Sequence, residues 1–177
     1  MKNLLIVNNV KTELGLDELE CIADMLNDSS RHSEVFYELS KLESVEIKES
    51  IASKHTITKE IVYSLINSQS IDVLRVLVGN RHAIPFFNRK CVRTLIETHD
   101  SEIYASMAQN LNDYAQVCNV ECLCEDLIVN DVQVKMVLAD NPDTPVFYLT
   151  ELASDADVSV AETAKNTLQS FVNNMEA

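Results

Sequence analysis

The feature that most constrains the fold is a helical repeat of apolar positions, which recurs every 25 to 31 residues. Each repeat ends at an anchor residue, and the six anchors are Asp28, Lys54, Asn80, Asn110, Asn141 and Asn166. Positions seven, three and two residues before an anchor share one face of a helix. They hold Cys21, Met25, Leu26; Ile47, Ile51, Ala52; Val73, Leu77, Val78; Ile103, Met107, Ala108; Val134, Leu138, Ala139; and Ser159, Thr163, Ala164. Only the sixth set departs from apolar character, which indicates a polar cap.

A second helix is expected after each of the first five anchors, with four extra residues in the third unit and six in the fourth. Its three core positions follow the spacing i, i+1, i+4, again one helical face. They hold Val35, Phe36, Leu39; Ile61, Val62, Leu65; Cys91, Val92, Leu95; Leu123, Cys124, Leu127; and Tyr148, Leu149, Leu152. Ser33, Thr58 and Thr144, the last followed by Pro145, are residue types that suit helix starts.

These patterns predict an all-α fold, an α–α superhelix of about six short helical hairpins in a single domain. One hairpin cannot bury its apolar stripes alone, whereas stacked hairpins share a continuous core. The expected units are 14–43, 44–70, 71–100, 101–131, 132–157 and 158–177, the last as a C-terminal cap. The chain has two Gly and three Pro, too few for an all-β protein, so at most a short strand is expected at Leu4–Val7. A coiled coil is disfavoured because polar joints interrupt the apolar pattern.

Residues 134–160, VKMVLADNPDTPVFYLTELASDADVSV, resemble a unit of the leucine-rich repeat variant family. The rest of the chain is similar to HEAT-like helical hairpins in a more general way. The resemblance implies a right-handed α–α superhelix with a role in interaction and no activity common to the family. The other units lack the Asn-Pro and Thr-Pro pairs and two are lengthened, which argues against a uniform superhelix between residues 80 and 125.

Charge and cysteine usage restrict the partners and the compartment. The formal net charge is −14, which disfavours binding to nucleic acid and to anionic membranes. The apolar stretch at the N-terminus is too short for a signal peptide, and no stretch approaches the length of a membrane span. The five cysteines are then expected to be reduced thiols in a cytoplasmic protein.

No group of residues forms a recognisable catalytic or metal-binding motif. Cys118, Cys122 and Cys124 have the spacing of metal ligands but lack a fourth, and the repeat places Cys21, Cys91 and Cys124 at core positions. The histidines belong to no nucleophile or zinc motif. The chain is therefore expected to need no cofactor and no metal.

The lengthened third unit contains the candidate binding site. This segment holds Arg and aromatic side chains, residue types enriched at binding hot spots, in an inserted connection. The candidate residues are Arg81, His82, Phe86, Phe87, Arg89, Lys90 and Arg93. Alternatively, both phenylalanines fold back to cover a widened gap between repeats.

The sequence favours a non-enzymatic protein–protein interaction module that uses the surface of the superhelix. An alternative interpretation is an acidic inhibitor or immunity-type protein that neutralises a basic enzyme such as a nuclease toxin. A protein partner is expected in either case, and the inhibitor interpretation predicts a basic one. An enzyme acting on nucleic-acid bases would need a strongly basic groove, which this composition does not supply.

Overall fold

A computed structural model describes residues 3–7, 10–128 and 131–175. The chain divides into two compact units, Met1–Ala83 (unit 1) and Ile84–Ala177 (unit 2). Apart from an N-terminal hairpin, the regular structure in the described part of the chain is helical, so the predicted all-α class is confirmed. No helix in these ranges is long and apolar enough to cross a membrane.

The hairpin consists of β1 (Asn3–Val7) and β2 (Val10–Leu14), which pair antiparallel with Asn3 opposite Leu14. The expected strand at Leu4–Val7 is present. The second strand was not expected, because VKTEL carries no apolar alternation long enough to predict a strand.

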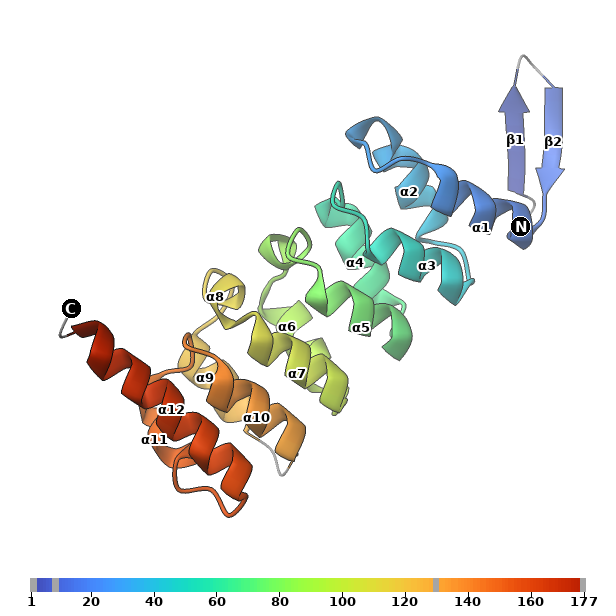
Figure 1. The fold of residues 1–177 in the computed structure, drawn as a ribbon. Coiled ribbons are helices and arrows are strands. Elements are labelled where there is room, and N and C mark those ends of the chain that lie inside the picture. The colour runs from blue at the N-terminus through green and yellow to red at the C-terminus, as the bar shows by residue number, and fades with distance from the viewer. Residues whose placement is uncertain (1–2, 8–9, 129–130, 176–177) are drawn as a thin grey trace. The chain divides into compact units, whose positions relative to one another are not determined.

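Unit 1 continues as two rows of helices (Figure 1). The first row holds α1 (Leu16–Met25), α3 (Val45–Ala52) and α5 (Ile71–Gly79). The second row holds α2 (Ser33–Leu39), preceded by the 3-10 turn η1 (Ser30–His32), and α4 (Lys59–Asn67). Helix α3 packs against α1 and α5, and α2 packs against α4.

Unit 2 has the same two-row arrangement. Its first row holds α7 (Ser101–Gln109), α10 (Val132–Asp140) and α12 (Val158–Met175), with α10 packed between the other two (Figure 1). The remaining elements are η2 (Ile84–Phe86), α6 (Arg89–Ile96), α8 (Leu111–Tyr114), α9 (Val120–Leu127) and α11 (Val146–Leu152). The short turns η2 and α8 lie in the two lengthened connections.

Burial confirms the predicted apolar register in the middle of the chain and corrects it at both ends. The first-helix positions of α3, α5, α7 and α10 are all fully buried. The second-helix positions are also buried, except Val35, which is 41% exposed, and Tyr148, which is partly exposed, so these two assignments to the core were wrong. In α1 the register is wrong, because Leu19 and Ala23 face the core while Met25 is 84% exposed. In α12 the buried residues are Val160, Ala161 and Ala164, so only Ala164 of the three expected positions is buried.

Two anchor asparagines join neighbouring first-row helices. The side-chain amide of Asn80 donates to the carbonyl oxygens of Ala52 and Lys54, at 2.7 and 2.9 Å. The amide of Asn141 donates in the same way to Ala108 O at 2.6 Å and Gln109 O at 3.4 Å. The last carbonyls of a helix have no partner within it, so each asparagine satisfies carbonyls at the end of the preceding first-row helix.

Ser33 and Thr58 mark helix starts as expected, Ser33 as the first residue of α2 and Thr58 as the residue before α4, although Thr58 makes no side-chain cap. Other helices begin with a side-chain cap. Asn88, Asp100, Asn119 and Asp131 accept hydrogen bonds from backbone N–H groups in the first turns of α6, α7, α9 and α10. Pro145 is the residue before α11 rather than its first residue. The buried hydroxyl of Thr144 donates to Leu138 O at 2.8 Å, so it closes α10 instead of starting α11.

Candidate binding surfaces

The predicted segment is divided between the two units. Arg81 and His82 are exposed at the end of unit 1. The other five candidates belong to unit 2, where Arg89, Lys90 and Arg93 are exposed on α6. The two phenylalanines differ, because Phe87 is 6% exposed and Phe86 is 36% exposed. The binding role of these residues remains a prediction.

Phe87 is part of the core of unit 2. Its ring lies 6.0 Å from that of Tyr114, a fully buried side chain of α8. Burial raises the pKa of Tyr114 well above its ordinary value. The alternative that the phenylalanines fold back into the core therefore holds for Phe87. Phe86 is the one of the two whose ring is exposed enough to contact a partner.

Arg81 and His82 line a shallow hollow of about 390 Å³ in unit 1, together with Ser53, His55, Val76, Gly79 and Asn80. The rings of His55 and His82 stack with their centroids 4.8 Å apart. The carboxylate of Asp28 accepts hydrogen bonds from the backbone N–H groups of His55 and Thr56 and from the Thr56 hydroxyl. Burial opposes ionisation of Asp28, but these hydrogen bonds outweigh it and lower the pKa of the carboxyl group.

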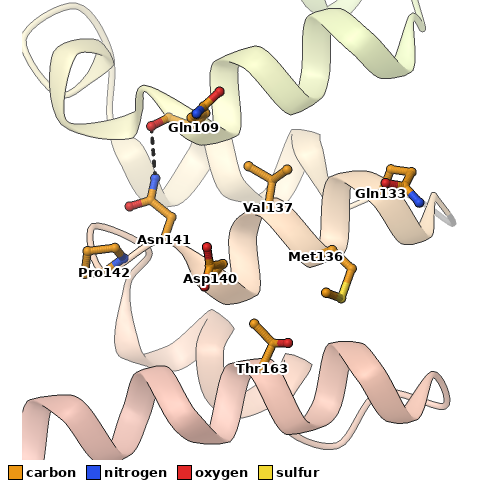
Figure 2. Close-up of a pocket in the computed structure, with 8 residues that line it drawn as sticks. All are labelled: Gln109, Gln133, Met136, Val137, Asp140, Asn141, Pro142 and Thr163. Carbon is orange, nitrogen blue, oxygen red and sulfur yellow. Dashed lines mark hydrogen bonds between the residues drawn. The ribbon is translucent and has the colours of Figure 1, made fainter.

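In unit 2, a groove of about 610 Å³ runs along α10 (Figure 2). Figure 2 shows Gln133, Met136, Val137 and Asp140 on α10, with Thr163 of α12 pointing toward them. Gln109, Asn141 and Pro142 complete the lining. The hydrogen bond from Asn141 to Gln109 O links the end of α7 to the end of α10 at one end of this groove.

Polar amides, apolar side chains and one carboxylate, that of Asp140, line the groove. Each glutamine amide offers both donors and an acceptor, which match the N–H and C=O groups of a peptide main chain. Met136 adds a flexible apolar contact. Asp140 is the only ionisable residue among the eight that line the groove.

A half-buried ion pair links α10 to the segment between α11 and α12. Lys135 Nζ lies 2.8 Å from a carboxylate oxygen of Asp155, and both side chains are less than one-fifth exposed. The hydrogen bond from Lys135 lowers the pKa of Asp155, with help from the backbone N–H of Asp157.

The cysteines do not form a site in the part of the chain that the structure describes. No group of three His, Cys, Asp or Glu side chains there is placed to hold a metal ion. Cys91 and Cys124 are buried as predicted, and burial raises the pKa of Cys124 to about 12. Cys21 is exposed, so its assignment to the core was wrong, for the same reason as the register of α1.

The sequence analysis did not single out two exposed apolar residues at the start of α11. Val146 is 57% exposed and Phe147 is 72% exposed. A signal was available, because the repeat aligns these positions with polar pairs or with a cysteine in the other units. The aligned pairs are Ser33–Glu34, Lys59–Glu60, Arg89–Lys90 and Glu121–Cys122.

Comparison of the chain with protein-family models, with curated proteins and with solved structures finds no match. Any functional inference therefore depends on the surfaces described above.

Proposed function

We propose that this protein is a non-enzymatic protein-binding module, built as an α–α superhelix of about six helical-hairpin repeats. The observation that supports this function best is the groove along α10. Its amides and its apolar side chains suit a polypeptide segment, which brings main-chain polar groups and apolar side chains together. The anchor hydrogen bonds of Asn141 hold two of the helices that form the groove in a fixed spacing.

The test is partner capture with a variant that fills the groove. Met136→Arg places a long charged side chain in the groove, and Met25→Arg places the same side chain at an exposed position outside it. The immobilised wild-type protein and both variants are incubated with a lysate of the native host, and retained proteins are identified by mass spectrometry. We expect one protein to be retained by the wild type and by Met25→Arg, and lost with Met136→Arg. Equal retention by both variants would contradict a role for the groove.

A second function is favoured by the distribution of charge. Residues 84–177 carry 15 acids and five bases, net −10, whereas residues 1–83 carry 13 acids and nine bases, net −4. An acidic inhibitor of a basic enzyme would use this surface for electrostatic attraction. Association with such an enzyme would slow steeply as salt increases, while binding through the groove, which has a single carboxylate, would depend less on salt.

A further inference from the structure

The outward face of α11 combines apolar and aromatic side chains. Leu149 and Leu152 are buried, so the helix turns Val146 and Phe147 toward solvent. The Tyr148 ring lies next to that of Phe147, with centroids 5.2 Å apart and planes at 82°. Val146, Phe147 and Tyr148 are together called the α11 patch. A contiguous group of exposed apolar and aromatic side chains is typical of protein interaction sites.

The α11 patch is anchored to the neighbouring helix α9. The Tyr148 hydroxyl donates to the carbonyl oxygen of Glu121, at 3.0 Å. Tyr148 is therefore held at both ends, by its own backbone in α11 and by this bond to α9. The ring of Phe147 rests against a fixed neighbour and presents its free surface without a large loss of side-chain freedom on binding.

Carboxylates surround the α11 patch. Glu121 and Glu125 are exposed on α9, and Glu151 is exposed one turn after Phe147 on the same face of α11. Burial, together with the negative charges of Glu125 and Glu121, raises the pKa of Tyr148. Within the described ranges, no lysine or arginine pairs with these three glutamates or covers the Phe147 or Tyr148 ring.

In unit 1, lysines of the chain itself form cation–π contacts with partly exposed aromatic rings. Lys41 Nζ lies 3.8 Å from the centroid of the Tyr37 ring, and the same lysine pairs with Glu38 at 2.7 Å. Lys59 lies over Tyr63 at 5.6 Å. A cation between an aromatic face and a carboxylate satisfies both. In the α11 patch the aromatic ring and the carboxylates are present, but the described part of the chain places no lysine or arginine between them.

We propose that the α11 patch binds a basic amphipathic segment of a protein partner. A lysine or arginine of that segment lies over the Phe147 ring and beside Glu121 and Glu125, and an apolar side chain packs on Val146. This proposal rests on the protein-binding function proposed above, but it uses the α9–α11 face rather than the groove along α10.

The test uses fluorescence anisotropy with labelled synthetic peptides and the full chain. The probe peptide alternates lysine with leucine, and the control peptide has glutamate in place of lysine. Two changes alter the patch, Phe147→Ser and the pair Glu121→Gln with Glu125→Gln. Their matched controls are Met25→Ser, an apolar residue that is also largely exposed, and the pair Glu34→Gln with Glu43→Gln, which changes the net charge equally.

We expect the lysine peptide to bind and the glutamate peptide not to bind. Each patch change should weaken binding by about tenfold, as loss of a central anchor or of two charge contacts does. The control changes should leave the affinity within about twofold, since scattered surface residues contribute little. Melting temperatures should be unchanged throughout, because all the altered side chains are exposed.

Three results would overturn the proposal: no binding of the lysine peptide, no effect of Phe147→Ser, or equal weakening by the two glutamine pairs, which would indicate unspecific charge attraction. The proposed function is tested separately by adding Met136→Arg to the set. Binding that is lost with Met136→Arg but unaffected by the patch changes would reject the α11 patch and retain the groove.

Discussion

Units 1 and 2 join their first-row helices in the same way but differ in whether lysines cover their aromatic rings. In both, an asparagine after a first-row helix binds carbonyls at the end of the preceding one, Asn80 in unit 1 and Asn141 in unit 2. In unit 1, lysines cover the rings of Phe36, Tyr37 and Tyr63. In unit 2, Phe147 is left bare among carboxylates. The difference shows that the helical framework does not dictate the exposed face of α11, which is therefore free to serve binding.

The largest expected effect separates the two kinds of aromatic residue in unit 2. Phe87→Ala should lower the free energy of unfolding by about 3–5 kcal/mol, because it removes a buried ring from the contact with Tyr114. Phe147→Ala should change it by less than about 0.5 kcal/mol, as for an exposed residue. Urea denaturation of both variants measures the difference. A loss above about 2 kcal/mol for Phe147→Ala would mean that its ring is part of the core.

A smaller effect tests the construction that the units share. Asn141→Ala and Asn80→Ala should each destabilise the protein by about 1–3 kcal/mol, because helix-end carbonyls lose their donor. Asn141 should cost more, since it is 9% exposed and water replaces its amide less easily. Chemical denaturation gives both values, with Asn166→Ala, an exposed anchor on α12, as the control. Equal, negligible losses would show that the anchors do not couple the helices.

The smallest effect compares one carboxylate from each unit at acid pH. The folded-state pKa values of Asp28 and Asp155 lie below the ordinary value of 3.8. Each therefore contributes stability that is present above this pH and is lost as the pH falls through the lowered pKa. Asp155→Asn should cost about 1.5 kcal/mol at neutral pH, the lower end of the range for a hydrogen bond to a charged group, because water still reaches the pair.

Urea denaturation of Asp155→Asn and Asp28→Asn at neutral pH and well below pH 3.8 checks the sign. The difference in the free energy of unfolding between wild type and each variant should become smaller at the lower pH, because the wild-type carboxyl group is then protonated. A difference that does not change with pH would mean that the ionised carboxylates do not stabilise the fold.

Much of the framework was predictable because helix packing leaves a periodic trace in the sequence. Ile47, Val73, Ile103 and Val134 stand at equal steps before their anchors and are all fully buried. The register failed in α1 and α12, where Met25 and Ser159 stand at expected core positions and are exposed, while Leu19 and Val160 are buried instead. The β2 strand failed for a different reason, since its residues show no strand periodicity.

The candidate surfaces were less predictable than the framework. The Arg81–Arg93 segment was chosen by composition, and composition could not show that Phe87 turns inward while Phe86 does not. The groove along α10 brings together Gln109, Gln133 and Thr163 from three helices, a proximity that depends on packing. Phe147 could have been found from the sequence, because the equivalent outward position is polar or a cysteine in the other repeats.

The most direct test of a binding role for unit 2 is hydrogen–deuterium exchange with the partner retained in the capture experiment. We expect binding to slow amide exchange in unit 2, at α10 along the groove and at α9 and α11 around the patch. Exchange in α1 to α5 should stay unchanged. Protection confined to unit 1, with exchange in α9, α10 and α11 unaffected, would contradict both proposed surfaces.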